Sequence, residues 1–158
     1  MKRKITLFIA TTALLGAVLV SAALGDNSAA SSQRPSKGAR VALGKTTLGK
    51  VLVDARGRTL YLFEKDKGPR STCSGACASA WPPVTTTGAP TAGMGVAAAQ
   101  LKTTMAPGGK QVLYAGHPLY TYVGDSGPGQ TTGEGLNQFG AEWYVLGANG
   151  GKIEKGGS

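Results

Sequence analysis

The stretch Thr59-Leu60-Tyr61-Leu62-Phe63-Glu64-Lys65-Asp66 decides the fold of this 158-residue chain, because it returns as Pro118-Leu119-Tyr120-Thr121-Tyr122-Val123-Gly124-Asp125. One offset, 59 residues, relates the two copies and further positions around them. The matching residues are Gly57, Leu60, Tyr61, Asp66, Gly68, Pro69 and Thr72, which recur as Gly116, Leu119, Tyr120, Asp125, Gly127, Pro128 and Thr131. A constant offset over this span indicates an internal duplication.

Each copy has the sequence pattern of a β-hairpin. In the first, residues 48–54 are short and β-branched, residues 55–58 are turn formers, and residues 59–63 resume an extended pattern. The second copy repeats this over residues 110–114 and 117–123, with a tighter turn between them. We therefore expect a mainly β fold, with antiparallel hairpins in two pseudo-symmetric repeats that form one small domain.

The segment between the copies is looser. Residues 96–100, Val-Ala-Ala-Ala-Gln, favour a short helical turn, and residues 102–105 favour a short strand.

Aromatic residues alternate along the repeated strand. Side chains of a strand point to opposite faces in turn, so Tyr61 and Phe63 share one face while Leu60 and Leu62 share the other. Tyr120 and Tyr122 pair in the same way in the second copy, and Trp81 and Trp143 close the two copies as equivalent anchors. We expect these aromatics to form a core across a pseudo-twofold axis. The alternative is an aromatic platform for a sugar or another planar ring.

Asp66 and Asp125 each begin the sequence Asp-x-Gly-Pro. A carboxylate before Gly and Pro is typical of a turn in which the side chain accepts backbone N–H bonds. A general acid and base pair would require the two carboxylates to converge.

The N-terminus has the pattern of a secretion signal. Lys2, Arg3 and Lys4 precede an apolar run from Ile5 to Val20, and small residues follow it. The predicted organisation is a signal peptide at 1–25, a disordered tether at 26–42, a two-repeat domain at 43–148 and a flexible tail at 149–158. The repeats cover about 48–84 and 103–147. An uncleaved signal would be the only membrane contact, since about 20 apolar residues can span a bilayer.

The chain is basic, with 17 Lys and Arg against 8 Asp and Glu, a net charge of +9. Loss of the three basic residues of the signal would leave +6. Such a charge is suited to binding an anionic cell-wall polymer, and we expect no specific nucleic-acid recognition. The alternative is that the charges only keep the surface solvated.

Three motifs together resemble the bacterial secreted repeat family. They are Tyr-x-Phe-x-x-Asp at 61–66, the Cys-x-Gly-x-Cys run at 73–77 leading into Trp-Pro-Pro at 81–83, and Gly-His-Pro-Leu-Tyr-x-Tyr-x-x-Asp at 116–125. The resemblance covers about 48–146. It implies an exported protein built from tandem repeats and implies no particular activity. Some members are predicted lipoproteins, whereas this chain has no Cys near the predicted cleavage site.

Cys73 and Cys77 are the two cysteines of the chain. In an oxidising compartment they most simply form one disulfide. Alternatively, the two thiolates form a soft site for copper together with His117, the chain's single His, or with Met94 or Met105. A role in haem handling or thiol redox chemistry is the remaining alternative. His117 takes the place of Arg58 in the repeat, where a solvated turn residue is also expected.

No motif identifies a catalytic residue or requires a cofactor. Ser, His and Asp are all present, but no Gly-x-Ser-x-Gly nucleophile elbow occurs. We therefore expect an exported, non-catalytic envelope or extracellular protein of uncharacterised role that binds an envelope protein or an anionic polymer. The alternative is a copper, haem or thiol-redox protein that uses Cys73, Cys77 and His117.

Overall fold

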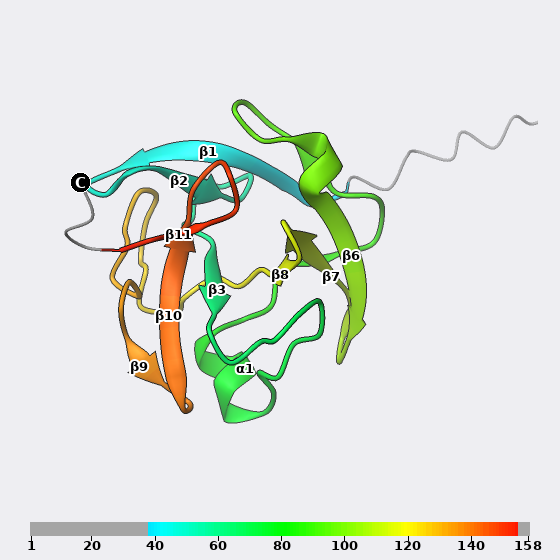
Figure 1. Ribbon diagram of the computed structural model, residues 1–158, viewed down its shortest axis with the longest axis vertical. Helices are drawn as coiled ribbons and strands as arrows, with labels where there is room; N and C mark the ends of the chain where they lie inside the picture. The colour runs from blue at the N-terminus through cyan, green and yellow to red at the C-terminus, as the bar shows by residue number, and fades with distance from the viewer. Residues whose placement is uncertain (1–37, 155–158) are drawn as a thin grey trace, which may run out of the picture. The chain divides into compact units, whose positions relative to one another are not determined.

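The computed structural model describes residues 38–154 (Figure 1). The predicted signal peptide, the tether up to residue 37 and the last four residues of the chain lie outside the described residues. Among residues 38–154, no helix is long and apolar enough to cross a membrane.

The described chain is mainly β, as predicted. Its strands are β1 (Arg40–Thr46), β2 (Gly49–Val53), β3 (Tyr61–Phe63), β4 (Thr85–Thr86), β5 (Thr91–Ala92), β6 (Leu101–Ala106), β7 (Gly109–Tyr114), β8 (His117–Pro118), β9 (Asn137–Gln138), β10 (Ala141–Leu146) and β11 (Lys152–Ile153). The helices are the short α1 (Ala76–Ala80) and the 3-10 helix η1 (Ala98–Gln100), which lies within the predicted helical turn.

Each repeat begins with an antiparallel hairpin, formed by β1 and β2 in the first and by β6 and β7 in the second. Both hairpins close with a two-residue turn, since Thr46 pairs with Gly49 and Ala106 pairs with Gly109. Gly108 in the second turn and Gly49, which directly follows the first turn, both have φ of 94°, a conformation that Gly adopts without steric cost. The sequence prediction missed the partner of β2, because Thr47 and Leu48 are not turn-forming residues.

The hairpin predicted over residues 48–63 is present only next to its turn. One bridge, Val53 to Thr59, and a hydrogen bond from Leu60 N to Leu52 O join its two arms. From Tyr61 on, the chain crosses to the other half, and β3 pairs with β10 of the second repeat. In the second repeat the predicted hairpin is present as β7 and β8, although β8 has only two residues.

The two repeats complete each other's sheets around a pseudo-twofold axis. Val145, two residues after Trp143, pairs with Tyr61, and Pro83, two residues after Trp81, pairs with Tyr120. At the centre, Tyr61 and Tyr120 exchange two backbone hydrogen bonds, of 2.9 and 3.0 Å. In Figure 1, β3 accordingly lies beside β10 and between the two hairpins.

The buried side chains divide as the alternation of the repeated strand predicts. Tyr61 and Phe63 lie in one cluster, with both cysteines, both tryptophans and Tyr120, and Tyr122 packs against it. Leu60, Leu62 and Leu119 lie in the other cluster, with Val41, Val112 and Leu146. Both faces of the repeated strand are therefore buried.

The ordered structure extends beyond the predicted domain limits of 43 and 148. β1 begins at Arg40 and pairs in parallel with β5, and Val41 is fully buried, so residues 40–42 are part of the fold rather than of the tether. At the other end, β11 pairs with β10 through Val145 and Ile153, within the predicted tail. Val41 is buried and Ile153 is partly buried, and both are too isolated in the sequence to show periodicity.

Candidate functional site

The repeated motif forms two equivalent hydrogen-bonded sites between the repeats. The hydroxyl of Tyr61 donates to Asp125 Oδ2 at 2.6 Å, and the hydroxyl of Tyr120 donates to Asp66 Oδ2 at 2.6 Å. Both tyrosines are fully buried and both carboxylates are 7% exposed. Each tyrosine is therefore satisfied by the aspartate of the other copy.

The second oxygen of each carboxylate closes a local turn. Asp66 Oδ1 accepts from the backbone N–H and hydroxyl of Thr72, both at 2.7 Å. Asp125 Oδ1 accepts from the same groups of Thr132, at 2.9 and 2.6 Å. The structural counterpart of Thr72 is thus Thr132 and not Thr131, because the second copy has gained one residue after the motif. The carboxylates occupy separate sites, each with its own tyrosine and threonine.

Burial and the neighbouring carboxylate keep both tyrosines protonated. Burial, and then the hydrogen bond to Asp125, raise the pKa of Tyr61 far above its ordinary value. Burial and the hydrogen bond to Asp66 raise the pKa of Tyr120 in the same direction. A phenol with a raised pKa is a stable donor, which suits a structural bond between the repeats.

Four aromatic rings stack through the centre of the domain, alternating between the repeats. They follow the order Phe63, Trp143, Trp81 and Tyr122. The two tryptophan rings are 3.9 Å apart and 4° from parallel. Tyr61 meets Trp81 edge-on, and Tyr120 meets Trp143 in the same way.

The tryptophan N–H groups share one acceptor residue. The indole of Trp81 donates to Gln138 Oε1 at 2.9 Å, and that of Trp143 donates to Gln138 O at 3.2 Å. Both rings are fully buried, and Phe63 is 1% exposed. These ring faces are occupied by one another, whereas an aromatic ligand platform needs an open face.

Cys73 and Cys77 form a disulfide that joins the segment before α1 to α1 itself, and both are 6% exposed. They belong to the cluster that contains Trp81 and Trp143. His117 is half-buried in β8, while Met94 and Met105 are 85% and 73% exposed. Within the described part of the chain, no three His, Cys, Asp or Glu side chains gather as metal ligands would. The metal and redox alternative stays a prediction, and it requires the disulfide to be reduced.

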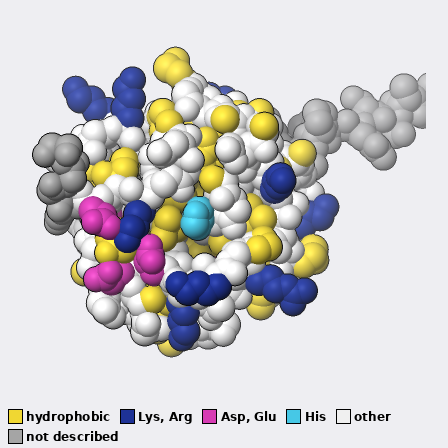
Figure 2. Space-filling model, viewed as in Figure 1, with side chains coloured by type: hydrophobic (Ala, Val, Ile, Leu, Met, Phe, Trp, Pro, Cys, Tyr) yellow, Lys and Arg dark blue, Asp and Glu magenta, His cyan; other side chains and the backbone are white. Residues whose placement is uncertain are grey.

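The acidic side chains are distributed unevenly between the interior and the surface. Asp66, Asp125 and Glu134 are buried, and Glu134 Oε2 accepts from Val145 N at 2.7 Å. Glu64 and Glu154 form ion pairs with Lys152, and Glu142 accepts from the nearby Tyr144 hydroxyl. Figure 2 shows acidic side chains gathered around a basic one on this face.

Basic side chains are exposed at several further places of the described surface. The exposed ones are Arg40, Lys45, Lys50, Arg56, Lys65, Lys67, Arg70, Lys102 and Lys110. Three of the described acids are internal, two pair with Lys152 and one contacts Tyr144, so the charged groups exposed on the rest of the described surface are mainly basic.

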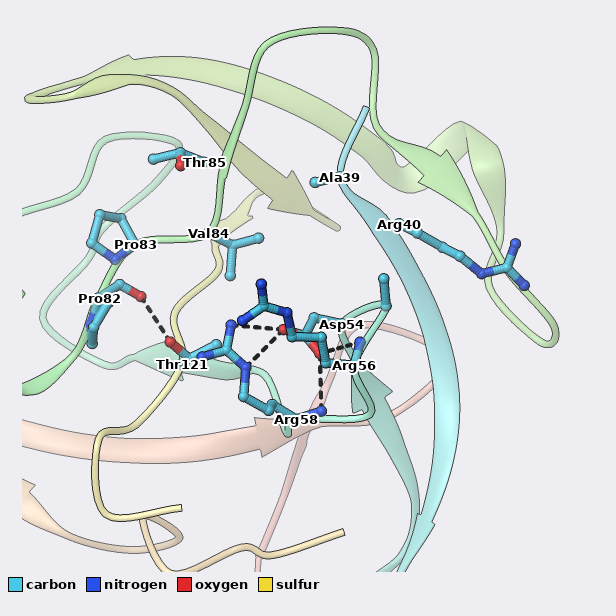
Figure 3. A pocket seen from close by; sticks show the side chains of 11 residues that line it. Ala39, Arg40, Asp54, Arg56, Arg58, Pro82, Pro83, Val84, Thr85 and Thr121 are labelled. Carbon is cyan, nitrogen blue, oxygen red and sulfur yellow. Dashed lines mark hydrogen bonds and ion pairs between the residues drawn. The ribbon is translucent and has the colours of Figure 1, made fainter. Parts of the chain in front are cut away.

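Three arginines line a pocket of about 440 Å³ (Figure 3). We call it the arginine pocket; its described lining is Ala39, Arg40, Asp54, Ala55, Arg56, Arg58, Pro82, Pro83, Val84, Thr85 and Thr121. This site was not predicted, because its residues come from four separate segments of the chain. The pattern Asp-x-Arg-x-Arg at 54–58 was the sequence feature that could have indicated it.

Comparison with known proteins gives one match. A family described as a secreted repeat of unknown function matches residues 42–85 and again residues 102–146. No curated protein and no solved structure matches the chain. The two matched segments correspond to the two repeats, so the expected resemblance is confirmed.

Proposed function

We propose that this chain, which belongs to the family of secreted repeats of unknown function, binds an anionic polymer of the cell envelope as an exported, non-catalytic protein. Export itself agrees with the family, whose description is that of a secreted repeat. The polymer, the envelope location and the absence of catalysis are the proposed parts.

The observation that carries the proposal is the separation of acidic from basic groups. The motif aspartates are buried and accept from Tyr61 and Tyr120, so the charged side chains exposed away from Lys152 are mainly lysines and arginines. A surface dominated by one sign of charge attracts polyanions over distances of about a Debye length. Binding of this kind needs no reacting group.

Salt dependence tests the proposal. The chain without residues 1–25 would be titrated with a poly(glycerol phosphate) oligomer and with a neutral polysaccharide of equal length. We expect measurable affinity for the polyanion only, weakened at least tenfold between 0.05 and 0.5 M salt, since screening shortens the reach of exposed charges. Affinity that is insensitive to salt, or equal affinity for the neutral polymer, would refute electrostatic binding.

The copper, haem or thiol-redox alternative makes a different prediction. It requires that Cys73 and Cys77 of the reduced protein become protected from alkylation when Cu(I) or haem is added, and that His117→Ala weakens this protection. A protein that reoxidises to the disulfide and is alkylated equally with and without these additions would remove this alternative.

A further inference from the structure

The arginine pocket has a rigid wall that holds one guanidinium in place. Asp54 follows β2, and its Oδ1 accepts the backbone N–H groups of Arg56 and Arg58 at 2.8 and 2.9 Å. Its Oδ2 accepts Arg58 Nε at 2.9 Å and Arg58 Nη2 at 2.8 Å. The carboxylate therefore both closes the turn and fixes the direction of the Arg58 side chain, which reduces the entropy lost on binding a ligand.

Arg56 adds a second guanidinium that has no such partner. Its backbone N–H contacts Asp54, but its exposed side chain takes part in none of the ion pairs found among residues 38–154. Figure 3 shows Arg56 and Arg58 both extending toward the wall that carries Val84 and Thr121, whereas Arg40 extends away. One carboxylate thus faces two guanidinium groups, which leaves the pocket with unbalanced positive charge.

The fold does not require this arrangement. The turn of the second repeat is one residue shorter, so Asp54, which follows β2, corresponds to Tyr114 at the end of β7, and Arg58 corresponds to His117. There the turn closes through Ala115 and Gly116, with φ of 50° and 88°, without a carboxylate or an arginine. The acidic and basic set is therefore particular to the first repeat.

The size of the pocket exceeds that of a single oxyanion. Its volume of about 440 Å³ lies within the usual range of small-molecule sites, about 300 to 1,000 Å³. Thr85 and Thr121 add hydroxyl groups to the lining. An anionic unit with an attached sugar or polyol would fill this space better than a free ion.

We propose that the arginine pocket binds one oxyanion group of the polymer, a phosphodiester or a carboxylate, through the guanidinium groups of Arg56 and Arg58. Arginine suits this role because its planar fork can bind two oxygens of one such group. This inference rests on the proposed function, since it assigns a specific site to polyanion binding that could otherwise be spread over the basic surface.

The test compares Arg56→Gln with Lys50→Gln in the chain without residues 1–25. Both changes remove one exposed positive charge, and both residues lie outside the core clusters. Lys50 is four residues before Asp54, roughly 13 Å along the strand, which is more than a Debye length at 0.15 M salt. Lys50→Gln therefore controls for the loss of charge alone.

The probes are a poly(glycerol phosphate) oligomer and an oligogalacturonate of equal charge, titrated in 0.15 M salt. We expect Arg56→Gln to weaken binding at least tenfold and Lys50→Gln to weaken it less than twofold. Arg56→Lys should recover only part of the loss, because an ammonium group cannot form the two-oxygen contact. The oligomer that shows the larger loss identifies the phosphodiester or the carboxylate as the preferred group.

Different binding results would overturn the pocket as the binding site and polyanion binding as the function. If the wild-type chain binds a polyanion and Arg56→Gln and Lys50→Gln weaken binding equally, the pocket is not the site and binding is spread over the surface. Full recovery by Arg56→Lys would likewise overturn the two-oxygen contact. If the wild-type chain binds neither probe, the proposed function fails along with the pocket.

Discussion

Tyr61 and Tyr120 each donate a buried hydroxyl to an aspartate of the other repeat. The sequence places Tyr and Asp five residues apart in one strand and turn, which favours a role within a single copy. The local part of that prediction agrees with the structure, since each aspartate accepts a threonine N–H in its own turn. The aspartate that accepts from each tyrosine was not predictable, because the offset between the copies does not show whether the hydrogen bond forms within one copy or between the two.

Tyr61→Phe is expected to lower the free energy of unfolding by about 2 kcal/mol, the usual range for a hydrogen bond to a charged group. The change leaves Asp125 Oδ2 buried without its phenol donor and also removes the acceptor of Gly133 N. Urea denaturation followed by tryptophan fluorescence measures the loss. Tyr144→Phe is the matched control, because its hydroxyl bonds to the exposed Glu142 and its removal should change stability little. Equal effects of the two changes would contradict the structural role of Tyr61.

Alkaline pH should destabilise the protein through the same tyrosines. Their pKa values are raised in the folded state, whereas an unfolded tyrosine titrates near 10. The unfolded state therefore loses protons first as the pH rises, so the tyrosine contribution is complete below pH 10 and declines above it. Denaturation between pH 8 and 11.5 should show this decline, and the slope should be shallower in Tyr120→Phe. An unchanged slope in that variant would rule out Tyr120 as a source.

At the level of secondary structure, the pairing of β3 with β10 organises the domain. Sequence patterns predicted the extended character of residues 59–63 and the two faces of that strand, because both depend on local alternation. They predicted the pairing of residues 59 and 60 with β2 but missed β10 as the partner of residues 61–63, because a short turn normally joins neighbouring strands along their whole length. The stacking of Trp81 on Trp143 depends on this crossing and was equally hidden, although their equivalence as anchors was predicted.

The disulfide next to α1 should contribute modestly to stability. It closes a loop with a sequence separation of four, so the chain-entropy model gives about 2 kcal/mol, toward the low end for disulfides. The protein with its disulfide reduced, and not alkylated, should therefore stay folded, with a lower melting temperature than the oxidised protein. Calorimetry with and without reductant measures the difference. Both cysteines are buried against aromatic rings, so the double variant Cys73→Ala/Cys77→Ala should also have a lower melting temperature than the oxidised protein. Complete unfolding on reduction would show that the disulfide is essential to the core.

At the scale of the whole domain, the two repeats divide the charges as well as the core. The net charge of +9 predicted a basic protein, but not that three acids are internal or that two others pair with Lys152. The arginine pocket was hidden for the same reason: its lining joins the turn after β2 to residues 82–85 and to Thr121. Burial and long-range proximity, which no local pattern encodes, produce both features.

The mutual dependence of the repeats is tested most directly by separating them. Fragments 38–96 and 97–154 each contain one tryptophan of the stack and half of each Tyr–Asp site. We expect either fragment alone to lack cooperative unfolding and the near-ultraviolet circular dichroism of packed aromatic rings. A 1:1 mixture should recover both signals. Cooperative unfolding with a native near-ultraviolet spectrum in either fragment alone would contradict the conclusion that the repeats fold only by completing each other.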